Sequence, residues 1–194
     1  MGLTEEYMGK TLSDMTLSEL WRMFPINLTE HKNIWATWYA EEKKRLVDIL
    51  PPKNIRISHV GSTAINGIWA KPIIDILVEI PMSLPMESIK KILVQNGYLC
   101  MSEQPNRKSF NRGYTNEGFA EKVFHLHLRY RGDNDELYFR DYLNENPSLA
   151  KQYEELKLAL WEKFKHDRDG YTLGKTDFVV EQTNNAKKSY GYRY

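Results

Sequence analysis

The sequence predicts an α/β (α+β) protein in which a short mixed β-sheet is flanked by helices and preceded by an N-terminal helical extension. Two strand-like apolar runs, residues 55–60 and 73–80, are separated by a turn rich in small residues. A third run, residues 122–130, alternates apolar and polar side chains as a half-buried strand does. Segments of helical periodicity lie before and after these strands, so we expect helices to cover the sheet.

The bulk composition indicates one globular domain. The chain has 194 residues, 41% of them hydrophobic, which is enough for a single core. We expect a helical extension over residues 1–30, a main domain over residues 31–188 and a flexible tail over residues 189–194. No segment approaches the roughly 18 consecutive apolar residues of a membrane-spanning helix, and the N-terminus lacks the features of a signal peptide. The protein is therefore not expected to enter a membrane.

The net charge and the cysteine content indicate which kinds of partner and which cellular compartment to expect. The net charge is +1, so a strong grip on long nucleic acid is not expected. The single cysteine, Cys100, excludes an intrachain disulfide and fits a reducing compartment, which predicts a cytoplasmic location. Nothing in the sequence indicates an oligomeric state.

The N-terminal part predicts two helices. Thr16 and Glu19 form a capping-box pattern ahead of a short apolar helix that ends before Pro25. A longer helix is expected over residues 31–49, because apolar and aromatic side chains recur there at helical spacing. Its tryptophans and tyrosines are interpreted as core residues.

Beyond the two central strands the pattern changes from helix to hairpin and back to helix. A helix over residues 86–95 is expected to end at Gly97, and a strand begins at residue 98. The polar residues 102–121 predict a hairpin region. Asp169-Gly170 is interpreted as a helix break. The remaining helices are expected over residues 137–143, 147 to about 165, and 172–188.

The turn between the two central strands predicts an anion-binding site. Gly61 can adopt a positive φ angle, and Ser62 and Thr63 add hydroxyl groups to the backbone N–H groups of the turn. Asp75 follows about a dozen residues later in an otherwise apolar strand. Burying a carboxylate without a hydrogen-bonding or ionic partner would destabilise the fold. The acid in this strand is therefore expected to have a partner or a function. The combination predicts a phosphate group at the turn and a divalent cation at Asp75.

The segment from His59 to Val78 resembles the signature of the GrpB-like (UPF0157) family, through His59-Val-Gly-Ser-Thr-Ala-Ile and Lys71-Pro-Ile-Ile-Asp-Ile-Leu-Val. Likeness continues at His125-Leu-His127 and Phe139-Arg-Asp-Tyr-Leu143, so the resemblance covers roughly residues 15–188. That family is assigned to the nucleotidyltransferase superfamily. The resemblance therefore implies a nucleotidyltransferase-like, DNA polymerase beta-like fold.

The resemblance also implies transfer of a nucleotidyl group from a nucleotide to an acceptor. In enzymes of this fold Gly-Ser lies at the phosphates, and carboxylates at alternate positions of the next strand share one face and hold metal ions. Asp75 occupies the first such position, whereas Leu77 at the second departs from active polymerase-like enzymes. Glu79 shares the face but lies roughly 13 Å along the strand, so it is expected to be a strand-end group.

Two histidines are candidates to complete the site. His125 and His127 project from one face of the alternating strand, about 7 Å apart, and could meet Asp75 across the sheet. Two imidazoles and a carboxylate would suit Zn²⁺ or Mn²⁺. Alternatively, the protonated histidines and Arg129 would contact phosphate directly. A purely structural interpretation makes both histidines hydrogen-bonded strand residues that face a polar cavity.

The remaining candidates are mostly basic. His59 lies beside the turn, where it either orients Ser62 or packs. Lys71 is expected to contact phosphate or pair with Asp75, and Arg140 either contacts phosphate or forms an internal salt bridge. Lys157 and Lys175 could reach the cleft, but lysines on a helix usually face solvent, and this is the default interpretation of both. A possible flap carries Arg107, Lys108 and Arg112.

We therefore expect binding of a nucleotide or another phosphorylated small molecule with a divalent metal, Mg²⁺ first and Mn²⁺ or Zn²⁺ as alternatives, with possible transfer of a nucleotidyl group to an unidentified acceptor. The alternatives are a nucleotide- or phosphate-binding module without transfer activity, which Leu77 favours, and a metal-dependent hydrolase. The expected catalytic and metal-binding residues are Asp75, His125 and His127. The expected phosphate- or nucleotide-binding residues are His59, Gly61, Ser62, Thr63, Lys71, Arg129 and Arg140.

Overall fold

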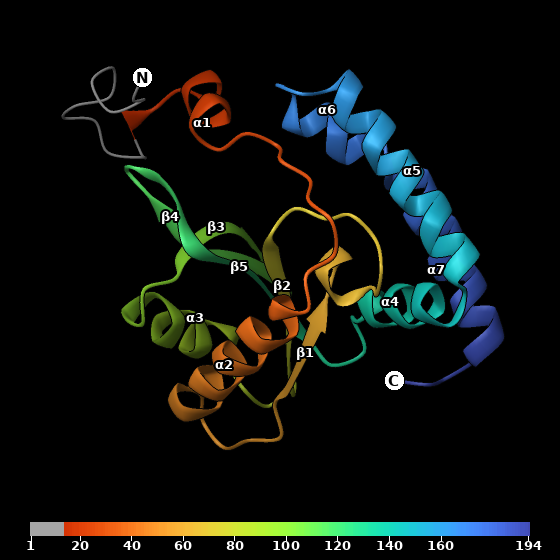
Figure 1. Ribbon diagram of the computed structural model, residues 1–194. Helices are drawn as coiled ribbons and strands as arrows, with labels where there is room; N and C mark the ends of the chain where they lie inside the picture. Colours follow the sequence, from red (N-terminus) through yellow and green to blue (C-terminus); the bar gives the residue numbers. More distant parts are fainter. Residues whose placement is uncertain (1–13) are drawn as a thin grey trace.

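The computed structural model describes residues 14–194, in which a five-stranded mixed sheet lies between two groups of helices (Figure 1). The first thirteen residues of the expected N-terminal extension lie outside this described part. The strand order is β1-β2-β5-β4-β3, with β2 antiparallel to β1 and parallel to β5. The predicted α/β class is confirmed. The strands are β1 (Arg56–Val60), β2 (Ile73–Ile80), β3 (Leu99–Gln104), β4 (Arg107–Thr115) and β5 (Gly118–Tyr130).

The helices follow the predicted order along the chain. The capping box of the first helix is confirmed, because the Thr16 side chain accepts a hydrogen bond from the Glu19 backbone while the Glu19 carboxylate accepts one from Thr16 N. A short 3₁₀ turn, η2 (Ser62–Ala64), follows β1. The helices are α1 (Leu17–Met23), α2 (Ile34–Ile49), α3 (Met86–Gln95), α4 (Asp135–Glu145), α5 (Pro147–Lys163), α6 (Arg168–Leu173) and α7 (Thr176–Tyr190).

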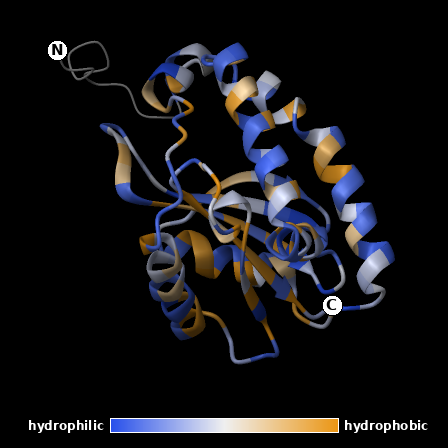
Figure 2. Ribbon diagram, turned by 45° about the vertical axis from the view of Figure 1, so that its right-hand side comes forward, coloured by the Kyte–Doolittle hydropathy of each residue, from blue (hydrophilic) through white to orange (hydrophobic). Residues whose placement is uncertain are grey.

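The two faces of the sheet have different roles. Successive side chains of a strand point to opposite faces, so even-numbered residues of β2, such as Ile74 and Val78, pack into the largest core cluster with α2 and α3. Odd-numbered residues, Asp75 among them, face α4–α7. Figure 1 shows these helices on the opposite side from α2 and α3. Hydropathy follows the same division, with hydrophobic residues concentrated in the central strands and many hydrophilic ones on α5 (Figure 2).

The last part of the chain corrects one sequence prediction. Asp169-Gly170 does not break a helix; it lies inside α6, which precedes α7 as a separate element. The Asp167 side chain accepts a hydrogen bond of 2.8 Å from Gly170 N and so caps α6. A Cβ atom on Gly170 would lie 2.4 Å from Asp167 Oδ2 and 2.6 Å from the Phe164 ring. This glycine therefore allows α6 to pack closely on the end of α5.

The C-terminal tail, expected to be flexible, contacts α4. The Tyr194 hydroxyl donates a hydrogen bond to Asp141, and Arg193 Nη1 lies 2.9 Å from Glu145 Oε1. Arg140 lies between this tail and β1, because its Nη1 donates to the His59 carbonyl at 2.8 Å. Among the described residues, no helix is long and apolar enough to cross a membrane.

A buried carboxylate fixes the end of the sheet opposite the turn after β1. Glu79 is fully buried, and Arg56 Nη2 lies 2.7 Å from its Oε1 while Arg56 Nε contacts its Oε2. Asn134 Nδ2 donates to the same Oε1 at 3.1 Å. Glu79 is thus a strand-end group, as expected, and its charge is compensated by a partner on the neighbouring strand.

We predict that Arg56→Met destabilises the fold by about 3 kcal/mol, because it leaves the Glu79 carboxylate buried without a cation. Urea unfolding at neutral pH measures the change. The matched control is Lys122→Met, which breaks the exposed Lys122–Glu41 pair and should alter the free energy of unfolding by less than about 0.5 kcal/mol. Equal effects of the two variants would contradict the prediction.

Candidate functional site

The turn after β1 packs directly against β2. Gly61 has φ 72°, and a Cβ atom built on it would lie 2.3 Å from Asp75 Oδ2. Thr63 is buried, and its hydroxyl donates to the Ile73 carbonyl at 3.2 Å. The turn is therefore held at the start of β2, with its glycine in contact with the Asp75 side chain.

His59 supports this turn from behind. Its Nε2 lies 3.0 Å from Thr63 Oγ1, and its ring stacks on Tyr39 with 4.7 Å between centroids. Burial lowers the pKa of His59 to about 4, although the charge of Asp75 opposes this. His59 is therefore neutral at physiological pH. Because the Thr63 hydroxyl already donates to Ile73, His59 Nε2 is the donor to Thr63 Oγ1.

The parallel pairing of β2 with β5 places two histidines beside Asp75. Asp75 is in register with His125, and Leu77 with His127. Asp75 Oδ1 lies 3.5 Å from both His125 Nδ1 and His127 Nε2. Burial raises the pKa of the Asp75 carboxyl, but hydrogen bonds from the two histidines outweigh burial and hold this pKa below its usual range. Asp75 is therefore a stable carboxylate.

Tyr114 fixes the orientation of His125. Its hydroxyl lies 2.8 Å from His125 Nε2. If His125 Nδ1–H points to Asp75, Nε2 accepts a hydrogen bond from Tyr114. A bulge between Arg112 and Tyr114, with Gly113 at φ 90°, shifts the register of β4 here. The Tyr114 side chain thus reaches His125 although Asn111 is the residue paired with it in the ladder.

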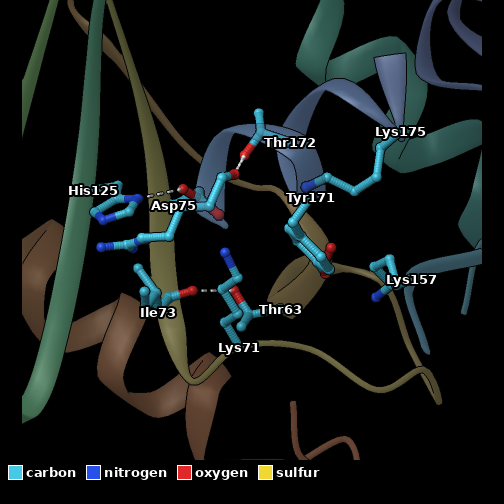
Figure 3. Close-up of a pocket in the computed structure, with 11 residues that line it drawn as sticks. Thr63, Lys71, Ile73, Asp75, His125, Lys157, Tyr171, Thr172 and Lys175 are labelled. Carbon is cyan, nitrogen blue, oxygen red and sulfur yellow. Dashed lines mark hydrogen bonds and ion pairs between the residues drawn. The ribbon is translucent and has the colours of Figure 1, made fainter. Parts of the chain in front are cut away.

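Asp75 and His125 border a cavity of about 240 Å³, which we term the main cavity. Figure 3 shows Asp75 and His125 on one side of it, Lys157 and Lys175 on the other, and Tyr171 between them. Its one carboxylate, Asp75, is outnumbered by four cationic side chains. The lining residues are Ser62, Thr63, Lys71, Ile73, Asp75, His125, Lys157, Arg168, Tyr171, Thr172 and Lys175.

The lysines of the main cavity are held in an unfavourable environment. Burial, reinforced by Lys175 and Arg168, lowers the pKa of Lys71 to about 7. Burial, reinforced by Lys175, likewise lowers the pKa of Lys157 to about 7. The Lys71 and Lys175 ammonium groups lie 4.5 and 4.7 Å from the centroid of the Tyr171 ring, which compensates them only partly. An anion that entered the main cavity would relieve this repulsion.

The structure brings some of the expected residues together and separates others. Ser62, Thr63, Lys71, Asp75 and His125 line the main cavity, with Gly61 against Asp75. His127 contacts Asp75 without lining the main cavity. Two expected phosphate contacts lie elsewhere: Arg129 faces Asp133 and Glu136, and Arg140 binds β1 and the tail. The flap candidates Arg107, Lys108 and Arg112 form ion pairs outside the main cavity.

Sequence reasoning missed three residues of α6 and undervalued two lysines. Arg168, Tyr171 and Thr172 all line the main cavity, but they lie around the Asp169-Gly170 pair that was interpreted as a break. Sequence reasoning favours solvent over the cleft for Lys157 and Lys175, whereas Lys157 is 1% exposed and donates to the Trp69 carbonyl. A signal was present for Lys157: it follows Tyr153, a core residue, by one helical turn.

The side chains around Asp75 suit Mg²⁺ better than Zn²⁺. Within residues 14–194, no group of three or more His, Cys, Asp or Glu side chains is placed to hold a metal ion. A zinc site with His125 and His127 therefore lacks the expected geometry. A single carboxylate suits Mg²⁺, which commonly takes its other ligands from substrate phosphates and water. Asp75 is the residue that would hold it.

Comparison with known proteins shows which family and which solved structures the chain is similar to. The profile of the GrpB protein family matches residues 25–185. The chain is 39% identical over 162 residues to the glutamate-rich protein GrpB of Alkalihalophilus pseudofirmus, covering 81% of this chain and 93% of that protein. It is similar to the crystal structure of the conserved protein GrpB from Enterococcus faecalis, with 28% identity, a TM-score of 0.74, and coverage of 84% of this chain and 99% of that one.

A more distant likeness identifies the fold class. The structure of the GLD-2/RNP-8 complex matches with a TM-score of 0.51 and 16% identity, covering 84% of this chain and 67% of that one. At this level of identity the match shows the fold alone. The expected nucleotidyltransferase-like fold is confirmed.

We predict that Gly61→Ala destabilises the fold more than Gly67→Ala does. Both glycines have φ 72°, so both substitutions strain the backbone by about 1 kcal/mol. Only Gly61 has a close neighbour, Asp75 Oδ2, whereas nothing lies within 4 Å of a Cβ atom on Gly67. Gly61→Ala should therefore cost an additional ~1–2 kcal/mol in urea unfolding. Equal costs would show that the Asp75 contact does not constrain the turn.

We also predict that the unliganded protein gains stability from pH 7 to pH 9. Unfolded lysines keep their protons up to a pKa of 10.5, whereas folded Lys71 and Lys157 lose theirs from about pH 7. The unfolded chain therefore binds more protons in this window, and each lysine contributes up to about 1.4 kcal/mol per pH unit. Unfolding free energies measured across the window test this. The variant Lys71→Met/Lys157→Met should have a flatter profile, and an unchanged slope would contradict the prediction.

Proposed function

This chain belongs to the GrpB family, and from that premise we propose that its main cavity binds the polyphosphate of a nucleotide and supports transfer of the nucleotidyl group to an acceptor. We further propose a cytoplasmic location, which the single free cysteine, Cys100, supports. The nucleotidyltransferase-like fold is compatible with transfer but does not specify it, because one fold hosts many functions. The argument therefore depends on the residues of the main cavity.

The convergence of four cations on one cavity carries the proposal. Lys71 comes from the segment just before β2, Lys157 from α5, Arg168 from the first turn of α6 and Lys175 from the position before α7. Fully protonated, these four cations outnumber Asp75, the one carboxylate among the described lining residues, and Glu154, whose charge also acts on Lys157. A single phosphate would leave part of this charge uncompensated. A triphosphate, with its several negative oxygens, matches both the number of cations and their distribution around the walls.

Asp75 and Ser62 define the end of the main cavity where the reaction would take place. A metal at Asp75 would neutralise phosphate charge and hold the α-phosphate in line with the acceptor. In the transfer, an acceptor oxygen bonds to the α-phosphorus, the bond to pyrophosphate breaks, and the hydroxyl proton passes to water. Lys71, Lys157 and Lys175 would hold the departing pyrophosphate. Ser62 would contact phosphate through its hydroxyl and the turn's N–H groups.

One observation favours a second candidate, a binding module without transfer activity. Leu77, at the place of the second acid, is fully buried in a small cluster with Val60 and Leu137. The face that would carry the second metal ligand is therefore apolar. In the described residues, no other carboxylate lines the main cavity with Asp75. The hydrolase alternative has less support, since no three-ligand group of metal-binding side chains is present there.

We predict that tripolyphosphate and nucleoside triphosphates with Mg²⁺ raise the melting temperature. Ligand at 100 times its Kd stabilises by about 2.7 kcal/mol, which corresponds to roughly 5–10 °C for a chain of this size. Lys157→Met should weaken tripolyphosphate binding about tenfold or more, because a charge-assisted contact in a desolvated site is lost. Differential scanning fluorimetry measures the melting temperature, and isothermal calorimetry the Kd.

Two further variants serve as a control for the lysine substitution and as a test of the Mg²⁺ dependence. Lys91→Met, an exposed lysine of α3 on the opposite side of the sheet, is the matched control and should bind as the wild type does. Asp75→Asn should abolish the part of the stabilisation that requires Mg²⁺. If no triphosphate stabilises the wild-type protein, the proposed function is wrong. Binding without any formation of pyrophosphate across a panel of hydroxyl-bearing acceptors would favour the binding module.

A further inference from the structure

A second, smaller cavity adjoins the main cavity, and we term it the annex. It has a volume of about 100 Å³ and shares Lys71, Ile73 and Arg168 with the main cavity. The volume corresponds to roughly three water molecules, so it can take the edge of a planar ring but not a whole nucleotide. The other lining residues are Pro25, Asn27, Pro72, Phe119, Ala120, Glu121 and Val123.

Phe119 gives the annex an aromatic wall. Phe119 is 38% exposed. Phe24 and Tyr114 hold it through T-shaped contacts, with ring centroids 5.0 and 5.1 Å away. The ring is thus fixed in position by other aromatics while part of its surface stays open. A rigid and partly exposed aromatic ring is a suitable platform for stacking a nucleobase.

The annex adds a carboxylate and an amide to the two cations that it shares with the main cavity. Glu121 places a carboxylate there, and Asn27 adds an amide. The carboxylate disfavours another phosphate, and it can accept hydrogen bonds from an amino group of the ligand. Lys71 and Arg168 lie at the junction, where they can contact a phosphate in the main cavity. The two cavities together match a ligand with a polyanionic end and an uncharged ring that carries N–H donors.

We propose that the annex binds the base edge of the nucleotide, that Phe119 stacks on this base, and that Glu121 selects bases with an exocyclic amino group over uracil. This inference rests on the proposed function, because it assigns the other end of the same ligand. It explains why the two cavities are contiguous and share two cations. It also assigns a role to the segment between α1 and α2, since Pro25 and Asn27 form one wall of the annex.

Calorimetric titration of the full chain with tripolyphosphate, ATP, CTP, GTP and UTP tests the proposal. Wild-type protein should bind ATP about tenfold more tightly than tripolyphosphate, the gain expected from stacking one base. Phe119→Ala and Phe119→Leu should both remove this gain while the Kd for tripolyphosphate stays unchanged. Glu121→Gln should reduce the preference for ATP over UTP. Met82→Ala, an exposed apolar residue outside both cavities, is the control and should leave all five Kd values unchanged.

The outcomes separate this inference from the proposed function. If tripolyphosphate binds and no nucleotide binds more tightly, the annex proposal is overturned while the main cavity remains a polyphosphate site. If nucleotides bind in a Phe119-dependent way and tripolyphosphate does not bind, the annex proposal stands and the polyphosphate assignment fails. If Phe119→Leu weakens tripolyphosphate and ATP equally, Phe119 supports only the fold and the proposal is overturned. If no ligand binds, both proposals are overturned.

Discussion

The contact between Gly61 and Asp75 is the constraint on which the rest of the site depends. The turn approaches β2 so closely that no side chain fits at residue 61, and the Thr63 hydroxyl holds it there through the Ile73 carbonyl. This contact fixes Asp75 from one side, and His125 and His127 fix it from the other. The carboxylate is therefore positioned by backbone and by two imidazoles before any ligand arrives. Such positioning avoids a cost that a flexible acidic side chain would incur on binding.

The same arrangement explains why cations gather opposite a single acid. Lys71, Lys157 and Lys175 are largely desolvated and close to one another, which costs stability in the unliganded fold. The rings of Tyr171 and Tyr153 and the charge of Asp75 compensate only part of that cost. The unliganded protein thus retains unfavourable repulsion that a polyanion would remove. The packing of α5–α7 keeps these lysines close together, and we therefore expect it to determine how strongly a polyphosphate would bind.

Local sequence patterns predicted the part of the site that depends on neighbours in the chain. A glycine followed by hydroxyl residues, an acid in an apolar strand and an alternating strand with two histidines were enough to bring Gly61, Ser62, Asp75 and His125 together. What they could not supply is tertiary packing. Lys157 points inward because α5 packs against α4 and the segment after η2, where Lys157 meets the Trp69 carbonyl. Arg168 and Tyr171 reach the main cavity because Gly170 lets α6 pack against α5. Arg129 lies away from the main cavity for the converse reason: it shares a face with His125, but carboxylates near the far end of β5 pair with it.

Leu77 occupies the position on β2 where a second metal-binding acid would be expected. On β2 the side chains of Asp75, Leu77 and Glu79 share one face, yet each meets a different environment: the main cavity, an apolar cluster and an ion pair with Arg56. An acid at position 77 would lie in the apolar cluster with Val60 and Leu137, where burial of its charge would be costly. Under the proposed function, phosphate charge would be balanced mainly by basic side chains. The four cations of the main cavity would supply that balance beside its single lining carboxylate, Asp75.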